Sequence, residues 1–161
     1  MLRKAVAESV GTAFLPTAVI GSGIMGERLA GGNVATALLA NAIATGATLV
    51  AIILAFGPIS GAHLNPAVTL ASPGGIPWRE VPGYLAGRVA GAFAGVAAAH
   101  LMFGEPLFFV ARHVRAGSAQ IFGEFIATFG LLSVIWGCVR FRSSAVPFAV
   151  GEFAIRSNCC S

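Results

Sequence analysis

One uncharged stretch in the first half of the sequence carries side chains suited to binding small polar molecules. Residues 57–70 read GPISGAHLNPAVTL. Asn65 is a favourable helix N-cap, and Pro66 suits the first helical position because proline has no N–H to leave unpaired. The apolar run from Ala67 to Ala71 is far shorter than the roughly 20 residues that cross a bilayer. These features predict a short half-helix that enters a membrane and ends inside it.

The chemistry of such an element is hydrogen bonding to neutral solutes. The Asn65 carboxamide can donate to a water or hydroxyl oxygen, while the backbone carbonyls of Gly61, Ala62 and His63 can accept. The positive end of the half-helix would repel cations and protons. Irregular backbone at membrane depth is tolerated where it lines a wet cavity. We therefore expect a narrow polar path, with His63 either facing it or satisfied within the loop.

The composition requires that lipid cover most of the chain. Hydrophobic residues make up 57% of it and charged residues only 10%, whereas about 25% is usual in soluble proteins. A fifth apolar run, Ala145–Ile155, is too short to span. Four stretches are long enough: Val6–Met25, Val34–Phe56, Val81–Phe103 and Ser118–Val139.

Charge and side-chain inventory exclude several other classes of protein. The net charge of +4 is small and scattered, which argues against nucleic-acid binding. We find no nucleophile–base set, phosphate loop or metal-ligand cluster, so we expect no enzyme, cofactor or metal site. Basic loop residues favour a cytoplasmic N-terminus in a bacterial inner or plasma membrane. Arg3, Lys4, Arg79, Arg140 and Arg142 would lie inside, against Arg28, Arg112 and Arg115 outside.

Two glutamates mark corresponding positions in two halves of the chain. Glu8 and Glu124 lie 124 − 8 = 116 residues apart, and each has a threonine four residues later. Three spans separate them, so the two copies would have opposite orientations, as in an inverted repeat. Residues 1–103 would form the first repeat, and 118–155 part of the second. We expect both glutamates to accept hydrogen bonds from loop amides, because no His or Asp chain accompanies them as in a proton relay.

The stretch SGAHLNPAVTL at Ser60–Leu70 resembles the first signature loop of the major intrinsic proteins, the aquaporins and glycerol facilitators. Residues 7–12 and 81–92 resemble the first and third helices of that family, and the resemblance covers about residues 4–151. It implies an all-α, polytopic bundle with three spans plus a re-entrant half-helix in a complete first half. The second half would be truncated after its first span. It also implies passive passage of water or small uncharged solutes, and a homotetramer in the lipid bilayer.

The same resemblance assigns roles to single residues. Asn65, Pro66 and Ala67 would form the first of two constriction signatures, and His63 would face the pore. Thr45 matches the position on the second helix that narrows the selectivity filter. A threonine, where many strict water channels carry an aromatic residue, leaves a wider and more polar opening. This suggests glycerol, or metalloid hydroxides such as arsenite.

The sequence also departs from the family pattern. A second Asn-Pro-Ala would be expected near 65 + 116 = 181, whereas the sequence has 161 residues, and residues 152–161 read as an aberrant tail. We expect a truncated or frame-shifted reading, and the alternative function is a non-conducting or partner-binding remnant. Arg88 stands where the family commonly carries a neutral polar residue, and Pro16 interrupts the first helix. Glycines at 83, 87, 91 and 95 favour tight packing within the bundle over a subunit contact.

Overall fold

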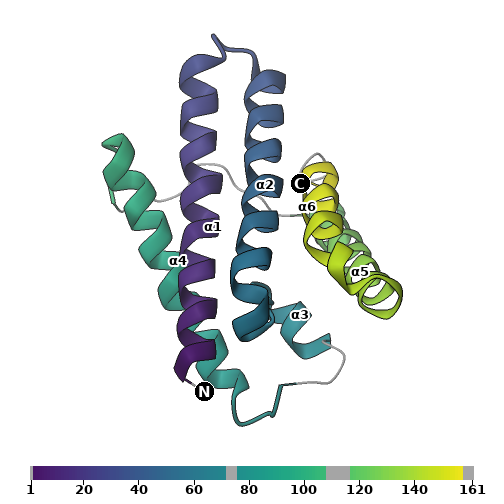
Figure 1. Ribbon diagram of the computed structural model, residues 1–161. Helices are drawn as coiled ribbons and strands as arrows, with labels where there is room; N and C mark the ends of the chain where they lie inside the picture. Colours follow the sequence, from purple (N-terminus) through teal and green to yellow (C-terminus); the bar gives the residue numbers. More distant parts are fainter. Residues whose placement is uncertain (1, 72–75, 108–116, 158–161) are drawn as a thin grey trace.

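The computed structural model describes residues 2–71, 76–107 and 117–157, in which every regular element is a helix and there is no strand. The bundle is therefore all-α, as expected (Figure 1). Four helices are long and apolar enough to cross a membrane: α1, α2, α4 and α5. The elements are α1 Leu2–Leu29, α2 Val34–Ser60, α3 Pro66–Ala71, α4 Val81–Phe103, α5 Ser118–Phe141, the 3₁₀ turn η1 Ser143–Ala145 and α6 Val146–Ser157.

The second helix is longer than its apolar pattern predicted. It continues past Gly57 and Pro58 to Ser60, where the sequence indicated a loop. Pro58 lies in the last turn, so its missing N–H costs one helical hydrogen bond and leaves the rest of the helix intact. Gly61 ends the helix in the left-handed conformation (φ 88°), and its N–H donates to the Gly57 carbonyl. The extra turn brings Ser60 to the base of the loop.

The first helix runs without a break through Pro16. One turn of it is tied to α4, because the Thr17 hydroxyl lies 2.8 Å from the Ala13 carbonyl and 3.0 Å from the Gly95 carbonyl. Helix α1, Leu2–Leu29, begins earlier and ends later than the apolar stretch Val6–Met25, and Pro16 does not interrupt it.

Helix α1 lies between α2 and α4 and packs on both (Figure 1). The approach of α4 depends on its glycines. A Cβ at Gly91 would collide with the Ser9 carbonyl, and a Cβ at Gly95 with the Ala13 carbonyl. Gly91 and Gly95 of the small-residue ridge therefore pack against α1 within the chain, which confirms at these positions the interpretation favoured from the sequence.

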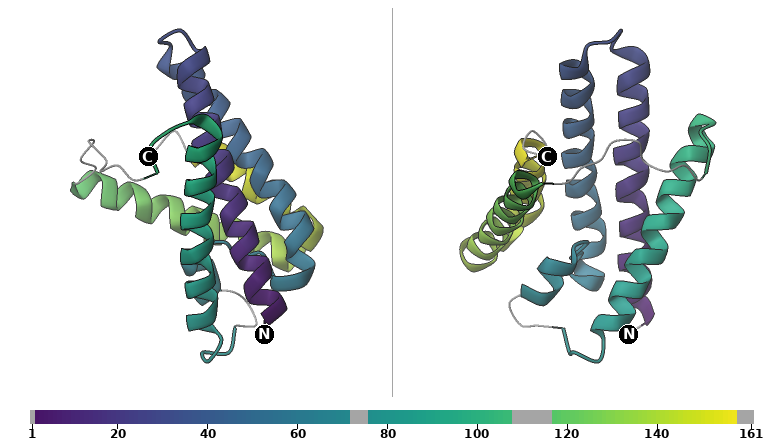
Figure 2. Two further views of the ribbon diagram at one scale, coloured as in Figure 1. Left: turned by 90° about the vertical axis from the view of Figure 1, so that its left-hand side faces the viewer. Right: turned by 180° about the vertical axis from the view of Figure 1, so that it is seen from behind.

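Helix α6 packs on α2, and α5 packs on α6. The contact between α6 and α2 is again made by glycines, since a Cβ at Gly46 would lie 2.6 Å from the Gly151 carbonyl oxygen. Helix α5 lies across the direction of α4, as the left-hand view of Figure 2 shows. It buries no residue. The large apolar side chains exposed along these helices fit the lipid environment that the composition predicted, for example Phe14, Leu39, Phe93 and Phe125.

Candidate functional site

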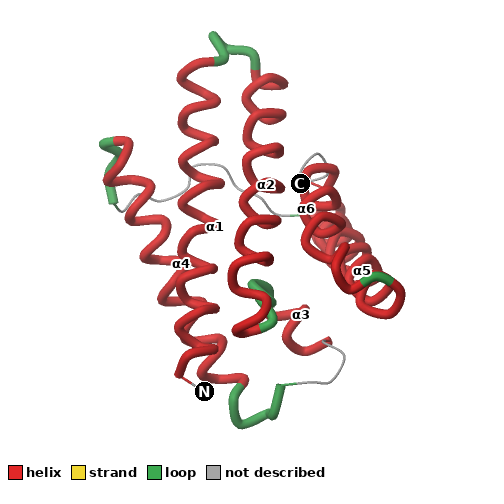
Figure 3. Tube along the Cα trace, viewed as in Figure 1, coloured by secondary structure: helices red, strands yellow, loops and turns green. Residues whose placement is uncertain are grey.

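The loop between α2 and α3 turns the chain back at the lower end of α2 in Figure 1, and it is drawn as the green segment there in Figure 3. Asn65 caps α3, because its Oδ1 accepts from the Ala67 N–H at 2.8 Å. Its backbone carbonyl accepts from Thr69 N at 3.1 Å. The Asn65 Nδ2 has no partner among the residues that the structure describes. The cap therefore uses the oxygen of this side chain and leaves its two N–H donors available.

The backbone of the loop is held in an uncommon conformation. Ala62 has φ 45° and Leu64 has φ 51°, both in the left-handed region that residues other than glycine rarely adopt. Each such residue costs on the order of 1–3 kcal/mol and persists only when its surroundings hold it. The interactions that hold this loop come from α1.

Glu8, on α1, accepts hydrogen bonds from the loop. Its Oε1 accepts from the His63 N–H at 2.9 Å and from the Ser60 hydroxyl at 2.8 Å. Its Oε2 accepts from the Leu64 N–H at 3.1 Å. The Ser60 oxygen in turn accepts from the Ala62 N–H at 3.1 Å. Glu8 is fully buried, so a desolvated carboxylate satisfies the amides that the uncommon backbone turns inward.

The partner of Glu8 was missed from the sequence. Arg88, on α4, donates to Glu8 Oε2 from Nε at 3.0 Å and from Nη2 at 2.8 Å. Its side chain is 5% exposed. The sequence marked Arg88 only as a departure from a family pattern. A signal was present, because lone opposite charges in two spanning helices are each expensive in lipid and are expected to pair.

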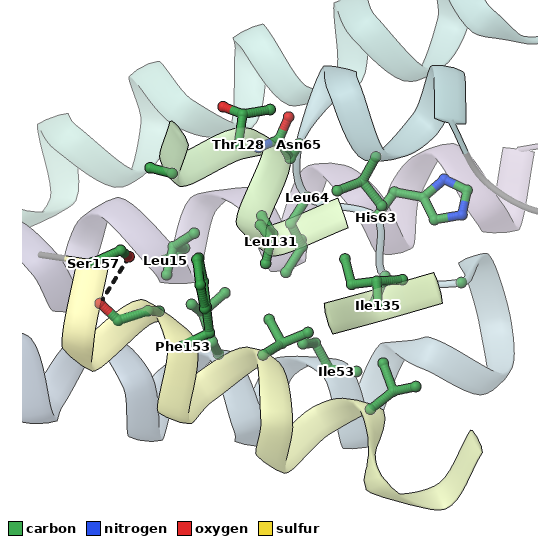
Figure 4. Close-up of a pocket in the computed structure, with 18 of the residues that line it drawn as sticks. Leu15, Ile53, His63, Leu64, Asn65, Thr128, Leu131, Ile135, Phe153 and Ser157 are labelled. Carbon is green, nitrogen blue, oxygen red and sulfur yellow. Dashed lines mark hydrogen bonds between the residues drawn. The ribbon is translucent and has the colours of Figure 1, made fainter. Parts of the chain in front are cut away.

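A cavity of about 450 Å³ opens between this loop, α5 and α6 (Figure 4). Five of the predicted site residues line it: Gly61, Ala62, His63, Asn65 and the expected acceptor Glu124. Side chains such as Leu15, Ile53, Leu131 and Phe153 make the rest of its wall largely apolar. Apolar walls with a few polar groups are typical of small-molecule sites. Thr128 also lines the cavity, although the sequence reasoning gave it no role there.

The remaining predicted site residues lie elsewhere or are only partly placed. Thr45 does not line the cavity, and its hydroxyl donates to the Asn41 carbonyl at 2.8 Å. It is one helical turn from Leu49, which does line the cavity. Pro66 and Ala67 form the first turn of α3 behind Asn65. Glu124 is exposed at the cavity wall and has no hydrogen bond within the described residues, so its role as an acceptor stays a prediction.

Helix α5 also contacts the half-helix directly. The Trp136 indole N–H donates to the Ala71 carbonyl at 2.9 Å. This bond holds the end of α3 against a helix from the expected second repeat. Within the described ranges, no three His, Cys, Asp or Glu side chains are grouped to hold a metal ion. His113, Cys159 and Cys160 lie outside those ranges, as do the last four residues of the expected tail, while α6 continues through Ser157.

Comparison with known proteins gives a consistent assignment. The model of the major intrinsic protein family matches residues 1–156. The chain is 48% identical to aquaglyceroporin AqpS of Rhizobium meliloti (strain 1021), over 95% of this chain and 66% of that protein. It is 40% identical to aquaporin NIP1-3 of Oryza sativa subsp. japonica, over 94% of this chain and 52% of that protein. The chain thus spans only about half to two-thirds of these relatives. It belongs to the major intrinsic protein family.

Proposed function

We propose that this chain forms part of a membrane channel for the passive passage of water and small uncharged solutes such as glycerol. The observation that carries the proposal is the divided use of the Asn65 side chain. Its oxygen caps α3, and its nitrogen, without a partner in the described structure, belongs to a residue that lines the cavity. The names of the relatives, an aquaglyceroporin and an aquaporin, support the same solutes.

The mechanism follows from fixed donors and acceptors. Because Oδ1 is held by the Ala67 N–H, the amide cannot flip and Nδ2 keeps its direction. A hydroxyl or water oxygen would accept from Nδ2 and donate to the backbone carbonyls of the loop, which replaces part of its hydration. The apolar wall offers no other hydrogen-bonding partner. Only a solute that can bond to the Asn65 amide and to the loop carbonyls together therefore recovers the hydrogen bonds that it loses with its hydration water. The partial positive charge at the start of α3 disfavours cations.

We propose that Thr45, which lies on α2 outside the cavity, limits the size of the solute that can pass. Its methyl and hydroxyl occupy less space than an aromatic ring, so glycerol is the expected solute alongside water. Arsenite-like metalloid hydroxides are an expectation from Thr45 alone. The same proposal includes a cytoplasmic N-terminus in a bacterial inner or plasma membrane and assembly as a homotetramer. The basic loop residues support the first point, and the family supports the second.

The test is solute flux into proteoliposomes that contain the purified chain, measured by stopped-flow light scattering. Asn65→Asp keeps an oxygen to cap α3 but removes the N–H donors and adds negative charge. We expect the variant to lose glycerol flux to the level of empty vesicles. The matched control is Asn33→Asp, because Asn33 caps α2 in the same way, through Thr36 N at 3.1 Å, away from the cavity. Its flux should equal that of the unchanged chain.

Two outcomes would count against the proposal. If vesicles that contain the unchanged chain swell no faster than empty vesicles, this chain is a non-conducting part of such a channel. If Asn65→Asp conducts as well as the unchanged chain, the amide donor has no role in permeation.

A further inference from the structure

The carboxylate of Glu8 is shared between the loop and a third helix. It accepts five hydrogen bonds, from Ser60 Oγ, His63 N, Leu64 N and two nitrogens of Arg88. We propose that Arg88 is the positioning residue of the Asn65 loop: its guanidinium fixes the Glu8 side chain in place through two hydrogen bonds, and Glu8 in turn holds the loop amides. This inference extends the proposed function to a residue that lines no part of the cavity.

Arg88 supplies the buried charge opposite Glu8 in this arrangement. Glu8 is 0% exposed and Arg88 is 4% exposed, so neither charge is compensated by water. Removing one partner of a buried ion pair leaves the other charge uncompensated, which is strongly unfavourable. Arg88 therefore holds the Glu8 carboxylate where it accepts from the His63 and Leu64 N–H groups at the same time.

The loop has reason to rearrange when these acceptors are lost. Ala62 and Leu64 both have positive φ, a conformation that must be held by its surroundings. The N–H groups of Leu64 and of the intervening residue His63 donate to Glu8. Without Glu8 they would be part-buried donors that have lost their acceptor. Asn65 follows directly, so the direction of its amide depends on the same two bonds.

Helix α4 provides a rigid base for Arg88. Gly91, one turn further along α4, packs so closely on the Ser9 carbonyl that a Cβ would collide with it. Ser9 is the neighbour of Glu8 in the chain. The distance from the α4 backbone to Glu8 is therefore set by helix packing, and the long arginine side chain spans it. Arg88 on α4 thus acts on Glu8 of α1, and Glu8 acts on the loop after α2.

The test measures hydrogen–deuterium exchange of the full chain in lipid nanodiscs, at the amides of His63 and Leu64. Arg88→Gln, which places a neutral polar side chain there, should exchange at these amides about tenfold faster or more, as expected when hydrogen bonds to a charged group are lost. Exchange in the middle of α2 should not change. Arg28→Gln is the matched control, because it removes an exposed ion pair with Glu105 at 2.8 Å and should leave the loop unaffected.

The double variant Glu8→Gln/Arg88→Gln separates positioning from general stability. A glutamine at position 8 needs no cation, so the added effect of Arg88→Gln should be much smaller in that background than in the unchanged chain. If Arg88→Gln does not fold, the same exchange is measured in Arg88→Lys, which keeps the charge but loses the two donors Nε and Nη2; faster exchange at His63 and Leu64 supports the proposal, and unchanged exchange overturns it. Unchanged loop exchange in Arg88→Gln also overturns it. The readout is independent of flux, so a chain that does not conduct would refute the channel proposal and not this one.

Discussion

At the scale of single residues, the site depends on buried polar groups that are hydrogen-bonded to one another. Ser60 is an example: its hydroxyl donates to Glu8 and its oxygen accepts from Ala62 N. It is 8% exposed. Losing one member of such a network leaves a buried donor and a buried acceptor unpaired, which costs more than an ordinary hydrogen bond contributes.

Ser60→Ala should therefore lower the free energy of unfolding by about 1–3 kcal/mol. Denaturant unfolding in detergent, followed by circular dichroism, measures this change. Ser133→Ala provides the control, since that hydroxyl donates only to the Phe129 carbonyl of its own helix and is exposed; its change should be small. Equal effects of the two substitutions would mean that Ser60 is not part of a stabilising network.

At this scale the local role of a residue could be predicted from the sequence better than the residues that it contacts. Asn65 as an N-cap followed from its type and from Pro66. Arg88 and Glu8 are 80 positions apart, and no periodicity in either helix reveals that their faces meet. The left-handed conformation of Ala62 and Leu64 was equally invisible, because neither residue type favours it.

At the scale of elements, glycines set the distances between helices. On α4 the glycines at 91 and 95 contact the backbone of α1, whereas a Cβ at Gly83 would meet nothing within 4 Å. Glycines at the same four-residue spacing on α4 thus include two that contact α1 and one, Gly83, with free space around it. The close packing of α1 and α4 is a condition for the Arg88–Glu8 pair.

Gly91→Ala should push α4 away from α1 and destabilise the bundle by about 1–3 kcal/mol, as overpacking does. Gly83→Ala should leave stability unchanged or raise it slightly, because alanine favours helix. Thermal unfolding of the two variants in the same detergent measures the difference. A Gly91→Ala chain as stable as the Gly83→Ala chain would show that this contact is not tight.

The existence of the helices was predictable from hydropathy, because four long apolar stretches have no other stable state in lipid. Their ends were not. Gly57 and Pro58 indicated a loop, yet a proline in the last turn costs little, and the helix ends only where Gly61 provides a left-handed cap. The crossing of α5 over the other helices (Figure 2) depends on packing that no local pattern encodes.

At the scale of the whole molecule, two groups of helices meet at the cavity. Helices α1, α2 and α4 hold the loop, and α5 and α6 close the opposite wall (Figures 1 and 4). The tie from Trp136 to Ala71 links the groups beside the half-helix. The inverted relationship of residues 1–103 and 118–155 remains a prediction, supported by the corresponding positions of Glu8 and Glu124.

The central claim is that Asn65 lies at membrane depth on a narrow aqueous path. The direct measurement is the thiol-labelling rate of Asn65→Cys, in a chain whose own cysteines are replaced by serine, with Asn33→Cys in the α1–α2 loop as the reference. We predict that a small, neutral, water-soluble reagent labels position 65, while a bulky charged reagent labels only position 33. Equal labelling of both positions by the bulky charged reagent would place Asn65 in bulk solvent and contradict the account.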